Sequence, residues 1–259
     1  MRNFGTANHP LRVSQLPYLV LCTWRAVALE LGITTREPSG KAADTGTAAH
    51  LGIATWHLNG KKLADAVAAM RAASAGFPLA DLDEAERFVT RYTDDPRNQE
   101  AEVVAVEQKV EVEIDPRFTS GPPIVIQGTC DQIRRVGGRL QVWDVKTGNR
   151  DALYFQNRHA LQLAAYTLAV SRMYVETVDP GGYVRIKGYF TRGASLPSPD
   201  GVFVPADIAD PDALLDAVRW AVCAIREGYY VPTPGEHCAD CPLTSNSFCV
   251  PMLARQKAA

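Results

Sequence analysis

Two aspartates and a lysine carry the residue types that can hold and use a divalent cation. Asp144 and Lys146 are two apart in a stretch of alternating apolar residues. In a strand, such residues point to the same face with about 7 Å between their Cα atoms. Asp131 lies in the preceding strand-like stretch, and a hairpin at Gly137-Gly138 places residues 131 and 144 roughly opposite each other. Two carboxylates at one strand end repel unless a cation takes both as ligands.

Phosphodiester hydrolysis is the chemistry that such a group supports. The reaction needs a nucleophilic hydroxide and neutralisation of the charge that builds on the phosphate oxygens, and a hard cation supplies both. Oxygen-rich ligation favours Mg2+, and an added imidazole from His50 shifts the preference toward Mn2+. The alternative for an isolated Asp-x-Lys is a surface ion pair between Asp144 and Lys146, which contributes only about 0 to 1 kcal/mol.

Helical spacing adds further candidates. On one expected helix His50 lies one turn after Gly46. On another, Gln162 and Tyr166 are four apart, so they share a face and can contact one substrate. The alternative for the second pair is an amphipathic helix whose tyrosine packs in the core.

These residues fall into four short motifs that follow one another along the chain: Gly46-x-x-x-His50, Gly128-x-x-Asp131, Asp144-x-Lys146-Thr147-Gly148 and Gln162-x-x-x-Tyr166. Together the motifs resemble those of RecB-like nucleases in the PD-(D/E)XK superfamily. The resemblance implies an α/β restriction-endonuclease-like core, with a mixed central sheet that starts mainly antiparallel and is flanked by helices. An N-terminal helical part and a C-terminal iron-sulfur tail would complete it.

The resemblance also implies a role for each motif residue. His50, Asp131 and Asp144 would be metal ligands, and the carbonyl of Val145 would also face the ion. Lys146 would hold or activate the attacking water. Gln162 and Tyr166 would hold the DNA backbone or a base near the cut.

Three of the six cysteines lie close together near the C-terminus, as Cys238-x-x-Cys241 followed by Cys249. That spacing suits one metal centre better than packing, and a fourth ligand is then needed. The layout resembles the branch that includes CRISPR-associated exonucleases and the AddB subunit. There, one distant N-terminal cysteine, here Cys22, joins three C-terminal ones around a structural [4Fe-4S] cluster.

Zinc is the competing metal, because four thiolates suit it equally well. The spread of the four cysteines along the chain is unlike a compact zinc ribbon. Cys130 and Cys223 are expected to be small buried thiols.

Several other polar residues stay open. Glu107 can be a further metal ligand, but alternation along its strand favours a solvent-facing position. His57, His159 and His237 are expected to be structural. Five arginines can form a local phosphate-binding patch: Arg134, Arg135, Arg139, Arg150 and Arg158.

The elements that must position these residues follow from hydrophobic period and turn residues. We expect a single nuclease domain over 1–259, with a helical N-terminal portion and cap (1–100), a sheet-and-helix core (101–192) and a C-terminal helix with the cysteine tail (211–259). The expected helices are 14–31, 46–58, 61–75, 80–92, 151–174 and 211–227. The expected strands are 106–114, 124–128, 129–136, 140–146 and 182–192.

The composition limits which kinds of partner the chain can bind. The net charge of −2 excludes a globally basic coating protein, so any DNA contact must be local. No apolar run suits a membrane span and no signal segment is present, so we expect a cytoplasmic protein without a membrane partner.

The favoured function is a nuclease for single-stranded DNA or DNA ends. Since no phosphate-binding Walker loop is present, a helicase or recombination protein would be a separate chain. A non-catalytic DNA-binding subunit and a site-specific endonuclease are the alternatives.

Overall fold

The computed structural model describes residues 3–31, 41–117, 121–147, 152–186, 202–205 and 208–230, with 232, 233, 235, 238, 241, 243 and 249. The chain divides into two compact units. Unit 1 comprises residues 1–38, 111–128 and 212–259, and unit 2 comprises 39–110 and 129–211. Strands β2 (Glu102–Ile114) and β3 (Ile124–Val136) each contribute residues to both units.

The fold is α/β with a mixed sheet flanked by helices, as the sequence predicts. The strand order is β1-β3-β4-β5-β6, and β2 pairs with β3. In unit 2, β4 (Arg139–Thr147) is antiparallel to β3 and parallel to β5 (Val178–Ile186), and β6 (Val202–Pro205) is antiparallel to β5. Parallel neighbours need a crossover, which α7 (Ala152–Tyr174) supplies between β4 and β5.

The predicted hairpin between β3 and β4 is confirmed. Gly137 and Gly138 have φ angles of 58° and 80°, the left-handed pair that a type I′ turn requires. Paired residues run from Val136↔Arg139 to Gln132↔Trp143. The next two positions are 131 and 144, so the expected register is confirmed as well.

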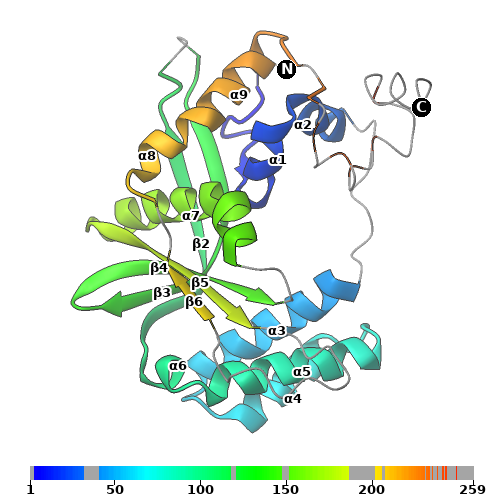
Figure 1. Ribbon diagram of the computed structural model, residues 1–259, viewed down its shortest axis with the longest axis vertical. Coiled ribbons are helices and arrows are strands. Elements are labelled where there is room, and N and C mark those ends of the chain that lie inside the picture. The colour runs from blue at the N-terminus through cyan, green and yellow to red at the C-terminus, as the bar shows by residue number, and fades with distance from the viewer. Residues whose placement is uncertain are drawn as a thin grey trace. The chain divides into compact units, whose positions relative to one another are not determined.

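Helices cover both faces of the sheet in unit 2 (Figure 1). On one side lie α3 (Lys41–Leu58), α4 (Leu63–Ala73), α5 (Leu79–Asp94) and α6 (Pro96–Glu100), and on the other lies α7. The crossing of α3 and α5 is close, because a Cβ added at Gly52 would lie only 2.5 Å from Cγ2 of Val89. The two helices therefore pack so closely at Gly52 and Val89 that no further carbon atom fits between them.

A buried polar network joins this helix layer to β3. The hydroxyl oxygen of Tyr92 accepts hydrogen bonds from Nε2 of Gln132 (2.7 Å) and from Arg134 (3.0 Å). Its own proton is then left for Nε2 of His57, 2.8 Å away, which must accept it. Burial first, and the charges of Arg134 and Lys61 after it, lower the pKa of His57 to about 3. His57 is therefore a neutral structural histidine.

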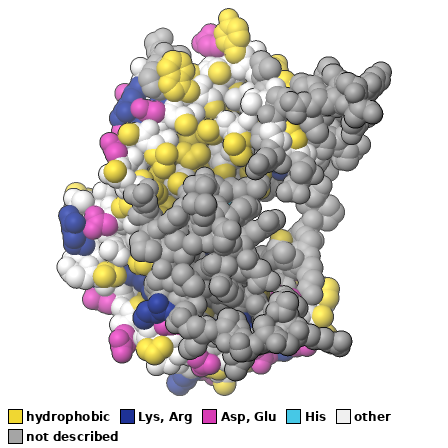
Figure 2. All heavy atoms as spheres, in the orientation of Figure 1, with side chains coloured by type: hydrophobic (Ala, Val, Ile, Leu, Met, Phe, Trp, Pro, Cys, Tyr) yellow, Lys and Arg dark blue, Asp and Glu magenta, His cyan; other side chains and the backbone are white. Residues whose placement is uncertain are grey.

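Unit 1 is built around the helices that begin and end the chain. Its elements are β1 (Leu11–Arg12), the 3-10 helix η1 (Val13–Gln15), α1 (Leu16–Leu21), α2 (Thr23–Glu30), α8 (Pro211–Leu214) and α9 (Asp216–Arg226). Four buried apolar residues of α9 recur at helical spacing: Val218, Ala221, Val222 and Ile225. On the face drawn in Figure 2, hydrophobic side chains gather over α9 and the surface beside it.

Some expected elements differ from those observed. The single helix over 14–31 is wrong, because Cys22 is extended (φ −156°, ψ 98°) and separates α1 from α2. Strands 124–128 and 129–136 are one strand, and the helix expected from 46 begins at Lys41. Strand β5 begins at Val178, while residues 187–192 of the expected strand lie outside the described part. Among the described helices, none combines the length and apolar character needed to cross a membrane.

The neutral state of His57 predicts a pH dependence of stability. Its pKa in the folded protein, about 3, lies below the ordinary 6.5. As the pH falls below 6.5, the unfolded chain takes up a proton that the folded chain excludes, so the free energy of unfolding decreases toward pH 3. We expect His57→Gln to reduce this decrease by at least about 1 kcal/mol between pH 6.5 and 4, as measured by chemical denaturation.

The control for this experiment is Asn59→Gln, which changes an exposed side chain that carries no titratable group. It should leave the pH profile of stability as in the wild type. Identical profiles for the wild type and His57→Gln would contradict the proposed protonation state.

Candidate metal centre and active site

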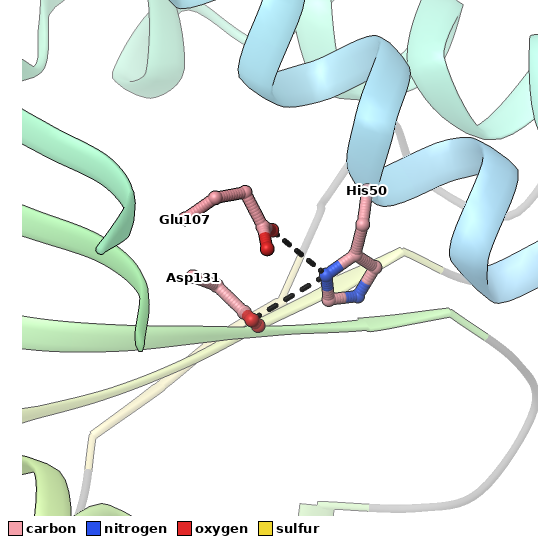
Figure 3. Close-up of side chains that lie close together, drawn as sticks. All are labelled: His50, Glu107 and Asp131. Atoms are coloured by element: carbon pink, nitrogen blue, oxygen red, sulfur yellow. Dashed lines mark ion pairs between the residues drawn. The ribbon is translucent and has the colours of Figure 1, made fainter. Parts of the chain in front are cut away.

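Three side chains from different elements of unit 2 converge beside the middle of β3. They are His50 of α3, Glu107 of β2 and Asp131 of β3, and one ligand atom from each lies within 4.8 Å of the others. Figure 3 shows both carboxylates directed at Nδ1 of the imidazole, from which each is 3.4 Å away. One nitrogen and two carboxylates so close together are a donor set that suits a divalent cation.

Asp131 ends the backbone pairing of the β3–β4 hairpin. Its Oδ2 accepts the backbone N–H of Val145 at 2.6 Å, while its Oδ1 faces His50. The paired residues of β3 and β4 end one position earlier, at Gln132↔Trp143. The carboxylate of Asp131 thus accepts the Val145 N–H that would otherwise bond to a carbonyl of β3. The backbone pairing of the two strands ends here, beside the carboxylates.

The second nitrogen of His50 has its own partner. Nε2 lies 3.0 Å from the carbonyl oxygen of Val145, which can only accept, so Nε2 carries a proton. A neutral ring then presents its lone pair at Nδ1, toward Glu107 and Asp131. A backbone carbonyl behind a ligating histidine commonly fixes the tautomer in this way.

Glu107 reaches the group through an unusual backbone conformation. Its φ angle is +48° in the middle of β2, a conformation that costs on the order of 1–3 kcal/mol for a residue other than glycine. The burial pattern of β2 changes phase beside it, from odd-numbered inward residues before 106 to even-numbered ones after. Glu107 is exposed, as the alternation predicts, yet its carboxylate lies 3.4 Å from Nδ1 of His50.

The charges of the three residues depend on one another. Burial lowers the pKa of His50, but Asp131 and Glu107 together outweigh it and raise this pKa well above its ordinary value. Burial likewise raises the pKa of Asp131, yet His50 and Lys146 outweigh it and leave the pKa lowered. The space between the three ligand atoms thus favours positive charge.

The predicted pair Asp144 and Lys146 lies on one face of β4. Nζ of Lys146 is 2.6 Å from Oδ2 of Asp144, whose side chain is buried. Burial, opposed by Lys146 and reinforced by Asp131, raises the pKa of Asp144 to about 6. This is a buried ion pair beside the three-residue group, unlike the surface pair that an isolated Asp-x-Lys would form.

Tyr166 of the α7 motif lies near the same carboxylates. Gln162 and Tyr166 are both buried, one helical turn apart. Burial raises the pKa of Tyr166, and the carboxylates of Asp144 and Asp131 raise it further. Tyr166 therefore keeps its proton and is a hydrogen-bond donor beside the carboxylates.

The structure corrects the expected arginine patch at one residue, Arg134. Arg134 is only 3% exposed and donates to Gln132, Asn98 and Tyr92, so it cannot meet a phosphate. Buried hydrogen-bond acceptors on α5 and α6, distant in sequence, hold it inside. Arg135 pairs with Glu176, and Arg139 pairs with Asp179. Gly148, Arg150, His237 and the side chain of Arg158 lie outside the described residues.

The four predicted cluster cysteines all belong to unit 1, and all are buried. Cys241 and Cys249 pack with Ala28 and Trp24 of α2, the helix that begins directly after Cys22. The backbone N–H of Cys241 donates to the carbonyl of Cys238, which brings these two into one turn. Cys130 and Cys223 are buried thiols, as expected.

Comparisons with known proteins place the chain in a family. No curated protein matches it. Among solved structures, the crystal structure of SSO0001 is similar, with 16% sequence identity, a TM-score of 0.39, and coverage of 88% of this chain and 93% of that one. The family model of the PD-(D/E)XK nuclease superfamily matches residues 11–246, a span that includes each residue of the candidate site. The chain thus belongs to the PD-(D/E)XK nuclease superfamily.

Proposed function

We propose that this chain is a metal-dependent deoxyribonuclease of the RecB-like type that hydrolyses phosphodiester bonds in single-stranded DNA or at DNA ends. The observation that carries the proposal is the convergence of His50, Glu107 and Asp131 beside the Asp144–Lys146 pair. Family membership supports a metal-dependent nuclease. The choice of DNA, of an exonuclease and of the ion is our inference.

The ligands that we assign to Mg2+ or Mn2+ are Nδ1 of His50 and the carboxylates of Glu107 and Asp131. Asp144, one position beyond the last paired residues of the hairpin, is the proposed further oxygen ligand. The Val145 carbonyl, which the sequence resemblance assigns to the ion, instead holds Nε2 of His50 in place. A bound divalent cation would act as a Lewis acid and lower the pKa of a bound water.

Lys146 and Tyr166 supply the donors around the reacting phosphate. The ammonium of Lys146 has three N–H donors, one of which is directed at Asp144. Lys146 is proposed to hold the attacking water and a phosphate oxygen, and Asp144, 2.6 Å away, restrains its flexible side chain. Tyr166, protonated because of its burial and the nearby carboxylates, donates to the same substrate.

The cysteines of unit 1 are proposed to hold a structural [4Fe-4S] cluster. The packing of Cys241 and Cys249 against α2, next to Cys22, supports a shared centre. Such a centre would stabilise the fold by linking residues that are far apart in sequence, which restricts the unfolded chain. A separate helicase or recombination protein is the proposed partner, in the cytoplasm.

Removing the Glu107 carboxylate tests the ligand set. We expect Glu107→Gln to weaken Mn2+ binding by about 10-fold or more, because one anionic ligand is lost. Isothermal titration calorimetry with Mn2+ measures this. The control is Glu111→Gln, an exposed acid on the same strand, which should bind Mn2+ like the wild type. Equal affinities for both variants would exclude Glu107 as a ligand.

Removing the Lys146 amine tests catalysis. We expect Lys146→Ala to slow cleavage by about 100-fold or more, because the water loses its donor. The substrates are end-labelled linear single- and double-stranded DNA and a closed single-stranded circle, with Mg2+ or Mn2+. The wild type should degrade the linear strands and spare the circle.

Lys109→Ala, on the exposed side of β2, is the control and should cleave like the wild type. Equal cleavage by Lys146→Ala would remove the proposed site. A wild-type protein that binds DNA without cutting it would instead indicate a non-catalytic subunit.

Removing one of the proposed thiolate ligands tests whether the cysteines hold an iron-sulfur cluster. We expect Cys249→Ala to lose the brown visible absorbance of the cluster and to melt at a lower temperature, because a long-range cross-link is gone. Cys223→Ala, a buried thiol of the same unit, should keep the colour. A colourless wild-type protein containing zinc would overturn this assignment.

A further inference from the structure

We propose that His159 is a positioning residue that turns the donor end of the Gln162 amide toward the DNA phosphate. The inference rests on the proposed nuclease function and adds a residue to it. His159 lies outside the four motifs, and a structural role is what its sequence alone predicts.

The contact that supports the proposal is within α7. Nδ1 of His159 lies 2.7 Å from Oε1 of Gln162, three residues further along the helix. The Gln162 side chain is only 8% exposed. Among the residues that the structure describes, Nε2 of this amide has no hydrogen-bond partner. A nearly buried amide therefore has its acceptor engaged and its two N–H donors available.

Gln162 shares a helix face with Tyr166, which lies near the carboxylate site. Tyr166 is one turn further on the same face, and the charges of Asp144 and Asp131 act on its hydroxyl. A substrate phosphate held between the metal ligands and α7 would thus meet the amide of Gln162. The substrate that this arrangement fits is an anion that accepts hydrogen bonds.

The chemistry of the two groups explains why a histidine is needed. An amide can turn about its last bond and present either oxygen or nitrogen, but only its nitrogen can donate to a phosphodiester. An imidazole with its proton on Nδ1 can only donate there, so it binds Oε1 and directs Nε2 away. Loss of this contact lets the amide present its oxygen, which a phosphate repels.

Three substitutions separate positioning from packing. His159→Asn keeps an N–H donor near the place of Nδ1, His159→Leu removes it, and His159→Asp replaces it with an acceptor. The readouts are kcat and KM on a labelled single-stranded oligonucleotide with Mn2+, and the melting temperature of the full chain. We expect the KM of His159→Asn to stay within about twofold of the wild-type value. We expect His159→Leu to raise KM about 5- to 10-fold, because roughly one hydrogen bond is lost.

His159→Asp gives the sharpest contrast. Its carboxylate would accept from Nε2 and turn Oε1 toward the phosphate, so we expect a larger rise in KM than for Leu. The change in kcat should be smaller than the change in KM in each case, since the amide binds the unreacted substrate as well. Repeating the three substitutions in a Gln162→Ala background should make their KM values equal, because the group they position is gone.

Each outcome bears on the inference. Unchanged KM for Leu and Asp, or an effect that persists in the Gln162→Ala background, would overturn it while leaving the nuclease intact. A lower melting temperature with no change in KM would also overturn it. A wild-type protein that cleaves no DNA would remove the nuclease function itself, and this inference with it.

Discussion

The hydrogen bond from the backbone of Val145 to the carboxylate of Asp131 is the interaction on which the site depends. It is short, 2.6 Å, and lies one position beyond the last paired residues of the β3–β4 hairpin. A backbone carbonyl in its place would continue the sheet and bring the strands together. The carboxylate satisfies the same buried donor and leaves its other oxygen for the imidazole of His50. The same carboxylate therefore ends the hydrogen-bonded pairing of the two strands and belongs to the proposed ligand set.

The remaining ligands are held by elements with different constraints. His50 is fixed at both ring nitrogens, by the Val145 carbonyl on one side and by two carboxylates on the other. The backbone of Glu107 is itself strained within β2, and such strain persists only where the surrounding structure enforces it. Behind them, the Tyr92 hydroxyl joins α3, α5 and β3 in a network that has few alternative arrangements.

Much of this could be predicted because it follows local rules. The Gly137-Gly138 turn fixes the register of the hairpin, and the register brings Asp131 and Asp144 to adjacent positions. Period-two and period-four spacing placed Lys146 beside Asp144 and Gln162 beside Tyr166.

What could not be predicted depends on contacts between distant residues. The approach of Glu107 to His50 accompanies a positive φ angle within β2, which alternation alone does not reveal. The burial of Arg134 depends on Tyr92 and Asn98, about 40 residues earlier, and charge alone favours the surface for an arginine. The break at Cys22 interrupts an otherwise helical apolar pattern. A sequence signal for His159 was present, since it lies three residues before Gln162 on one helix, but a histidine at that spacing is common in amphipathic helices.

The glycine at the crossing of α3 and α5 bears on His50, the proposed metal ligand two residues before it. Gly52 lets Val89 of α5 approach as closely as atoms allow, and so sets how deeply α3 sits against its neighbour. Ligand atoms must hold their places to within about 0.5 Å for a metal site to be selective. By allowing this close packing of α3 on α5, Gly52 contributes to the position of the His50 imidazole, and so of the proposed ligand atom.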